Sequence, residues 1–345
     1  MNCRVGPLAL RKANGSVLII ALWSLSFLTI LVLQMASGIR LKMKLIERVE
    51  HKNQLRHSAE AGVLKTIHVL NWDYLKTEGQ TTVNGKVLRH NNPELFQHQE
   101  IGNGFFDVHY DGQDNRGNKI FYGCVDEERK LNLNRADPPA LKILLEKIFN
   151  VDEKSAQSLA DAIIDWRRFA EGEIAGFYSD EFYENLEFPY EPKKGDYEVL
   201  EELFSVKGIT PEIYRILTEF VTIYGDGRVN INTAPFEVLI AQGLSEDLVK
   251  KILSVRRGKD QEDSTPDDYV FQDNFLIASN LSQFVEVSQE ESKQLEEMSI
   301  NGLIGTSSYF YKIKSEGKFS FDKGFKTIAC VYSPGEQRVV YWRED

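Results

Sequence analysis

The feature that most constrains this chain is an uncharged stretch near its N-terminus. No charged residue occurs between Ala13 and Ile39. The Ser16–Ile39 segment has 24 residues, and as a helix it would extend about 36 Å, which is enough to cross the hydrocarbon core of a bilayer. Secretory signals have a shorter apolar core and then a small-residue cleavage site, whereas Arg40 follows directly here. The segment therefore predicts a retained transmembrane helix.

Charge is divided unevenly along the chain. Residues 1–56 contain nine Lys or Arg and two acids, which gives a net charge of +7. The remaining residues contain 32 Lys or Arg and 50 acids, which gives a net charge of −18. An acidic body argues against a general nucleic-acid-binding protein. The three cysteines exclude a disulfide-dense scaffold, and a hydrophobic content of 42% is enough for a folded core.

Helical periodicity continues beyond the apolar segment. Apolar residues recur at spacings of mostly three or four between Leu41 and Leu70, and charged residues occupy the other positions. No proline interrupts this pattern. The sequence therefore predicts a stalk helix over residues 40–72 that continues the transmembrane helix of residues 16–39.

Two regions far apart in the sequence show strand patterns. Apolar residues in 105–110 and 120–125 flank a loop rich in Asn, Asp and Gly, which predicts a β-hairpin. Residues 308–343 predict three antiparallel strands with a turn at Ser333–Glu336. We expect both regions to share one sheet, because pairing them against the stalk helix covers an apolar face that would otherwise be exposed.

The block between these regions is helical and contains an internal repeat. Leu131–Ala136 matches Val229–Ala234 at an offset of 98 residues, and Ile163–Arg168 matches Ile252–Arg257 further along. Each unit runs from an Asn-rich start through one helix to a second helix that ends in Arg-Arg. Asp137 precedes a proline in the manner of a helix N-cap.

The N-terminal region resembles the type IV pilin-like proteins. It has a short basic leader that ends at Gly15, followed directly by the apolar run. In that family a prepilin peptidase cleaves after the glycine on the cytoplasmic side, and the apolar helix is kept and packs in a fibre core. The resemblance implies processing between Gly15 and Ser16. Ser16 departs from the aromatic residue or Met that most members carry, which leaves N-terminal methylation open.

A second departure concerns the fifth mature position, which is Glu in most pilins and Ile20 here. A carboxylate in lipid costs several kcal/mol unless it is paired, and family logic pairs it with the N-terminal amine of a neighbouring subunit. A subunit with no neighbour above it needs no such carboxylate. Ile20 therefore implies a tip or initiating subunit.

The helical block is similar to that of the minor pseudopilin K of type II secretion systems. The motifs that carry this resemblance follow one another in family order: Asp165–Trp166, Tyr197–Leu203, Val206–Ile209, Tyr224–Arg228 and Val229–Pro235. The resemblance implies an α+β fold in which a long transmembrane and stalk helix packs on a small antiparallel sheet, with an all-α insert of two helical domains like the sterile alpha motif. The expected N-terminal parts are a leader over 1–15, a transmembrane helix over 16–39 and a stalk helix over 40–72. The expected head consists of a first β part over 73–128, helical domains over 129–228 and 229–300, and C-terminal strands over 301–345.

The same resemblance implies a non-enzymatic role in assembly. The expected partners are the prepilin peptidase, other minor pseudopilins in a tip complex, the major pseudopilin, secreted substrate and the outer-membrane secretin, with no nucleic acid. The expected location is the inner membrane, crossed once, with the N-terminus in the cytoplasm and the head in the periplasm. After assembly the protein would lie at the pseudopilus tip.

Family members bind calcium in the helical insert, and an acidic segment of this chain is a candidate for that role. It contains Asp165, Glu171, Glu173, Asp180 and Glu181, whose carboxylate oxygens suit a hard cation if several converge. Arg167 and Arg168 stand where the family often has acids. A solvated acidic loop is the alternative interpretation.

Cys124 and Cys330 lie one in each β region. In an oxidising periplasm they are expected to form a disulfide, with two buried thiols as the alternative.

Three other functions remain as alternatives. A minor pilin of a type IV pilus would share the leader and the apolar helix. Helix-hairpin-helix DNA-binding proteins share the Asn-rich start and a segment like Val206–Ile209, but acids lie near Leu244, where phosphate would approach. An envelope enzyme is disfavoured because the sequence has no His-Glu-x-x-His pair, no Gly-x-Ser-x-Gly turn and no phosphate-binding glycine loop.

Overall fold

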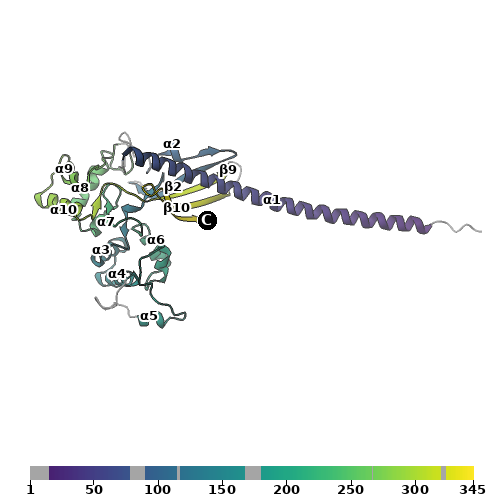
Figure 1. The fold of residues 1–345 in the computed structure, drawn as a ribbon, viewed down its shortest axis with the longest axis horizontal. Coiled ribbons are helices and arrows are strands. Elements are labelled where there is room, and N and C mark those ends of the chain that lie inside the picture. The colour runs from purple at the N-terminus through teal and green to yellow at the C-terminus, as the bar shows by residue number, and fades with distance from the viewer. Residues whose placement is uncertain (1–14, 78–89, 115–116, 168–179, 266, 320–323) are drawn as a thin grey trace, which may run out of the picture. The chain divides into compact units, whose positions relative to one another are not determined.

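A computed structural model describes residues 15–77, 90–114, 117–167, 180–265, 267–319 and 324–345 (Figure 1). The chain divides into two compact units, Met1–Gln54 and Leu55–Asp345. Helix α1 (Gly15–Thr77) contributes to both units and ends later than the sequence pattern indicated.

The first unit consists, in its described part, of the N-terminal portion of α1. Its large apolar side chains are exposed from Val17 to Val49. The hydroxyl groups in this stretch bond within the helix: Ser24 Oγ donates to the Ile20 carbonyl at 2.7 Å, and Ser26 Oγ donates to the Leu22 carbonyl at 2.8 Å. By length and composition this is the one described helix suited to cross a membrane, and its internally bonded hydroxyls suit a lipid environment.

The second unit is built on an antiparallel sheet against which the C-terminal portion of α1 packs (Figure 1). The strand order is β1-β2-β9-β10-β11, with β3 paired to β2 and β4 paired to β9. Both β regions expected from the sequence thus form one sheet, as predicted. The strands and the short helix before β1 are α2 (Pro93–Phe96), β1 (Gln99–Ile101), β2 (Gly104–Asp114), β3 (Gly117–Tyr122), β4 (Val125–Asp126), β9 (Tyr311–Phe319), β10 (Phe325–Ser333) and β11 (Arg338–Glu344).

Two glycines allow α1 to lie close to the sheet. A Cβ atom on Gly62 would clash with the Ser315 hydroxyl and the Phe106 ring, and one on Gly317 would clash with the Leu55 carbonyl. The core beside them combines buried α1 residues with inward-facing residues of β2, β9 and β10: Ala59, Val63, Leu70, Phe106, Val108, Ile313, Ile328 and Cys330.

The helical insert comprises two repeats, each closed by a parallel pair of two-residue strands. β5 (Leu131–Asn132) pairs with β6 (Val221–Thr222), and β7 (Val229–Asn230) pairs with β8 (Ile304–Gly305). The first repeat holds α3 (Pro138–Phe149), α4 (Glu153–Arg167), α5 (Asp180–Glu184), η2 (Leu200–Ser205) and α6 (Pro211–Leu217), and follows η1 (Glu127–Arg129). The second holds α7 (Phe236–Ala241), α8 (Glu246–Arg256), η3 (Asn274–Leu276), α9 (Ile277–Leu281) and α10 (Gln289–Ile300).

Equivalent residues of the two repeats make equivalent contacts. Arg167 in α4 donates to the carbonyls of Leu133 and Ala136. In α8, Arg256 donates in the same way to the carbonyls of Ile231 and Ala234. The first arginine of each Arg-Arg pair therefore holds the second helix of its repeat against the Asn-rich turn, while the helices of both repeats share one hydrophobic core.

The asparagines of each turn show the same correspondence. Asn134 exchanges two hydrogen bonds with the Tyr197 main chain, at 3.0 and 2.8 Å. Asn232 exchanges two with the Phe271 main chain, both at 2.8 Å. A side-chain amide is suited to this role because it donates and accepts at once, which explains why each turn carries Asn.

The disulfide expected between Cys124 and Cys330 is not formed, and both residues are buried thiols. Cys124 directly precedes Val125, which lies opposite Lys312 of β9, and Cys330 of β10 lies opposite Ile313. β9 therefore separates the cysteines by two strand spacings, about 10 Å, and a disulfide needs Cα atoms within about 7 Å. Burial raises the pKa of the Cys330 thiol to about 12.

Candidate functional site

Three consecutive acids join the sheet to the helical insert. Asp126 ends β4, and Glu127 and Glu128 begin η1, so that all three are buried. The side chains of Asn230, Thr233 and Ser308 donate to the Asp126 carboxylate, at 2.9, 2.5 and 2.6 Å. Burial raises the pKa of Asp126, although these hydrogen bonds oppose the shift. Asp126 thus ties the second repeat and the chain before β9 to the sheet.

Glu127 and Glu128 extend these contacts. Glu127 pairs with Lys130 at 2.9 Å and accepts from the Thr222 hydroxyl at 2.8 Å. Burial alone would raise the pKa of Glu127, but Lys130 and Lys312 outweigh it and lower the pKa. Glu128 accepts from the Tyr309 main-chain N–H. Burial and the nearby Asp126 raise the pKa of Glu128 to about 8.

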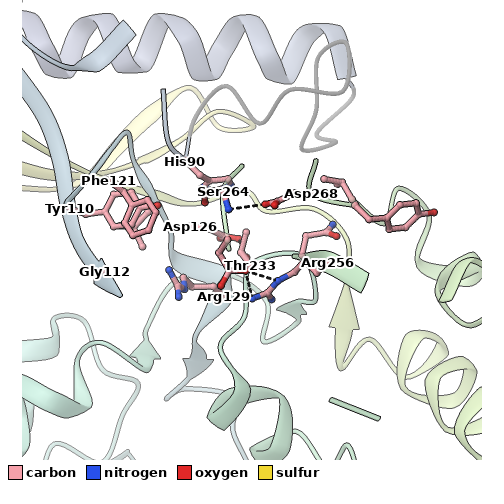
Figure 2. Close-up of a pocket in the computed structure, with 15 residues that line it drawn as sticks. His90, Tyr110, Gly112, Phe121, Asp126, Arg129, Thr233, Arg256, Ser264 and Asp268 are labelled. Carbon is pink, nitrogen blue, oxygen red and sulfur yellow. Dashed lines mark hydrogen bonds and ion pairs between the residues drawn. The ribbon is translucent and has the colours of Figure 1, made fainter. Parts of the chain in front are cut away.

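A cavity of about 100 Å³ lies beside this junction, between the sheet and the second repeat. Figure 2 shows the stacked rings of Tyr110 and Phe121 at one wall, 5.4 Å apart. Arg256 enters from the second repeat and pairs with Asp263 at 2.9 Å. Burial raises the pKa of Tyr110 to about 12. Most of the polar groups that line the cavity bond to one another, as in the pairs Thr233–Asp126, Arg256–Asp263 and Ser264–Asp268. The lining residues therefore connect the sheet to the insert.

A loop of the second repeat carries a cluster of acids that sequence reasoning did not single out. Ligand oxygens of Asp260, Asp267 and Asp268 lie within 4.8 Å of one another and could hold a metal ion. They also accept local hydrogen bonds, including one from the Lys259 N–H to Asp267 at 2.7 Å. In the sequence, the acids and hydroxyl residues between Gly258 and Asp268 are the pattern that could have indicated this cluster.

Of the calcium ligands expected in the first repeat, the structure describes little. Asp165 lies on α4 and is half-buried. Glu171 and Glu173 lie outside the described residues, as do the side chains of Asp180 and Glu181 at the start of α5. The proposed ligand set therefore stays a prediction.

The residues expected to act in processing and assembly lie in the first unit. Gly15 and Ser16 begin α1, and Ile20 follows one turn later with an exposed side chain. Their neighbours on the helix are apolar and exposed as well, including Trp23. This arrangement leaves the whole circumference of the helix available for lipid or for other helices.

Comparison with known proteins agrees with the resemblance found in the sequence. Residues 127–226 match the family model of type II secretion system (T2SS) protein K. The fold is similar to a chain in the crystal structure of the GspK–GspI–GspJ complex from the type 2 secretion system of enterotoxigenic Escherichia coli, with a TM-score of 0.58 and 15% identity over 88% of this chain and 99% of that one. No curated protein matches the sequence. The family match thus falls on the first helical repeat, whereas the similarity in fold extends over 88% of the chain.

Proposed function

We propose that this chain, a minor pseudopilin resembling protein K of the type II secretion system, occupies the tip of the pseudopilus and helps to start its assembly. The observation that carries the proposal is Ile20, an exposed apolar residue where most pilins have Glu. A carboxylate there needs the amine of a neighbouring subunit in the membrane to offset its desolvation. A terminal subunit lacks that neighbour, and an apolar residue suits it.

Processing and anchoring follow from the N-terminal region. The basic leader keeps Gly15 at the cytoplasmic face, where the prepilin peptidase cleaves before Ser16. The apolar part of α1 then anchors the protein in the inner membrane, with the head in the periplasm. The single-pass anchor in this proposal is supported by a helix of suitable length and composition.

The proposed partners are other minor pseudopilins, which together with this chain would form the tip complex. The similar solved structure is itself a complex of GspK, GspI and GspJ from a type 2 secretion system, which supports such contacts here. The major pseudopilin would follow below the tip. Secreted substrate and the outer-membrane secretin are the further partners proposed.

Labelling the position of the chain in assembled fibres tests this proposal. Pseudopili lengthened by overproducing the major pseudopilin would be labelled with antibodies to the acidic head. We expect one label at one end of each fibre, with the major pseudopilin labelled along its length as the control. Labels of the head spaced along the shaft would contradict the tip position.

A further inference from the structure

A short segment of α1 directly after the uncharged stretch alternates basic and apolar residues. It reads Arg40-Leu-Lys-Met-Lys-Leu-Ile46, and all of its side chains are exposed. Water suits the basic groups but not the apolar side chains between them. The border between lipid headgroups and acyl chains suits both, because Lys and Arg can extend their charged ends outward while apolar neighbours face the acyl chains.

The position of this segment along the helix matches the depth of lipid headgroups. The uncharged stretch ends at Ile39, and from Arg40 to Lys44 the helix rises by about 6 Å. The polar layer on each side of a bilayer is about 5–8 Å thick. In the anchor proposed above, the charges of Arg40, Lys42 and Lys44 therefore lie at the level of the lipid phosphates.

The three basic groups are available for a ligand. Among the residues that the structure describes, none pairs with the charged groups of Arg40, Lys42 or Lys44. The acids that follow are Glu47 and Glu50, and Glu50 accepts a hydrogen bond from the Gln54 side chain at 3.1 Å. Residues 40–44 thus carry three positive charges and no acid.

This charge is unusual for the side of the membrane on which the proposed topology places it. Basic residues normally concentrate on the cytoplasmic side of a membrane helix, and the leader supplies them there at Arg4, Arg11 and Lys12. The acidic body, with a net charge of −18, would be repelled by an anionic membrane surface. A basic segment at the periplasmic surface gives the chain a local attraction of opposite sign.

We infer that Arg40, Lys42 and Lys44 bind the phosphates of anionic phospholipids in the leaflet next to the head. The apolar side chains between them would contact the acyl chains below the phosphates. Each basic residue close to such a surface strengthens the attraction. The inference rests on the membrane anchor of the proposed function but not on the tip position.

The basic row continues beyond the headgroup layer and supplies a matched comparison. Arg48 and Lys52 follow Arg40 and Lys44 at spacings of four residues, so all four lie along one side of the helix. Arg48 lies about 12 Å above Arg40, outside the polar layer of the bilayer. An acidic row on a neighbouring helix would engage all four residues, whereas lipid would engage the lower pair.

Lipid binding to the full chain in detergent micelles tests the inference. Native mass spectrometry measures the affinity for phosphatidylglycerol, with phosphatidylcholine as the neutral comparison. Glycerophosphoglycerol, which is the same headgroup without acyl chains, serves as a soluble competitor. We expect phosphatidylglycerol to bind more tightly than phosphatidylcholine, and we expect the soluble headgroup not to displace it.

Two double variants locate the binding. Arg40→Gln/Lys44→Gln removes two charges at headgroup depth, and the control Arg48→Gln/Lys52→Gln removes the same residue types at the same spacing further along α1. We expect the first variant to lose about 30-fold in affinity for phosphatidylglycerol and the control to keep the affinity of the original chain. Far-ultraviolet circular dichroism confirms that each variant keeps its helix content.

Flotation of the chain with vesicles of phosphatidylcholine alone separates failure of the anchor from failure of this inference. A chain that does not float has no membrane anchor, and both proposals are then wrong. A chain that floats but binds phosphatidylglycerol no better than phosphatidylcholine, or loses affinity equally in both double variants, keeps its anchor and overturns only the inference. Displacement by glycerophosphoglycerol would assign the basic groups to a soluble phosphodiester and would also overturn it.

Discussion

At the junction between sheet and insert, Glu127 and Glu128 are neighbours with opposite pKa shifts. The pKa of Glu128 is raised to about 8 from a usual value of 4.5, so the folded chain binds this proton more tightly than the unfolded chain does. Its contribution to stability is therefore complete below about pH 4.5 and is lost as the pH rises through 8. The raised pKa of Asp126 acts in the same sense.

We predict that Glu128→Gln makes the free energy of unfolding less dependent on pH between 5 and 8. Glutamine copies the protonated form and still accepts from the Tyr309 N–H. At pH 8 the variant should be more stable than the original chain by about 4 kcal/mol, because the pKa rises from 4.5 to about 8 and each tenfold change in proton affinity corresponds to about 1.4 kcal/mol. Urea unfolding in detergent, followed by tryptophan fluorescence, measures this.

Glu127→Gln is the matched control at the adjacent position. It leaves the buried Lys130 ammonium without its carboxylate and should cost about 3–5 kcal/mol. If Glu128→Gln instead destabilises the chain equally at pH 5 and pH 8, Glu128 is ionised in the folded state and the prediction is wrong.

At the scale of elements, the close contact between α1 and the sheet depends on Gly62. We predict that Gly62→Ala lowers the melting temperature of the head, because the added methyl group meets the Ser315 hydroxyl and the Phe106 ring. Overpacking of this kind costs about 1–3 kcal/mol. Differential scanning calorimetry of the detergent-solubilised chain provides the measurement.

Gly38→Ala is the control on the same helix, because a Cβ there meets no atom within 4 Å. Alanine favours a helix over glycine by up to about 1 kcal/mol, so no loss of stability is expected. Equal destabilisation by both substitutions would show that helix propensity, and not contact with the sheet, determines the effect.

The acidic segments of the two repeats lead to a prediction about calcium. We propose that calcium binds the insert and expect it to raise the melting temperature of the chain, whereas magnesium at equal concentration does so less. Asp267→Asn tests the loop of the second repeat, and Asp180→Asn tests that of the first. The quantity to compare is the increase in melting temperature that calcium produces in each variant and in the original chain.

A loss of that increase in one variant assigns the ion to the corresponding loop. If calcium leaves the melting temperature of the original chain unchanged, neither loop binds it at the concentration used.

At the scale of the whole molecule, the maturation proposed above depends on a single glycine, Gly15. We predict that Gly15→Leu blocks cleavage of the leader, because the peptidase of the family requires a small residue before the cut. The uncleaved chain keeps Arg4, Arg11 and Lys12, so its net charge is −11 instead of −14. Immunoblotting of cells that express the peptidase shows whether the shorter form appears.

Leu10→Ala in the same leader is the control and should be processed normally. Normal maturation of Gly15→Leu would contradict the assignment of the leader.

The sequence predicted the architecture well where the signal is local. The two repeats were recognisable because each has its own Asn-rich turn and Arg-Arg helix end, and the sheet followed from alternating residues in two regions. The junction could not be predicted in this way. Asp126, Glu127 and Glu128 look like a solvated turn in the sequence. Their partners lie far along the chain: Asn230 and Ser308 donate to Asp126, Thr222 donates to Glu127, and Tyr309 donates to Glu128.

The cysteines show the same limit. Their placement in two β regions predicted proximity, and both do lie in the core beside α1. Only the strand order reveals that β9 lies between them. The residue types around the two cysteines correctly indicated a buried position in the sheet. Whether the two thiols can meet depends on the order of the strands.

The two ends of the helical insert have a consequence for how such a molecule could arise. The Glu127 N–H donates to the Phe310 carbonyl at 2.9 Å, and Asp126 lies opposite Tyr311 in the sheet. The chain therefore leaves the sheet and returns to it at adjacent points. A segment with such ends can be gained, lost or exchanged by a single genetic event without moving a strand. An internal repeat would then arise by duplication within that segment, and the rest of the head would keep one helix, α1, packed on one antiparallel sheet.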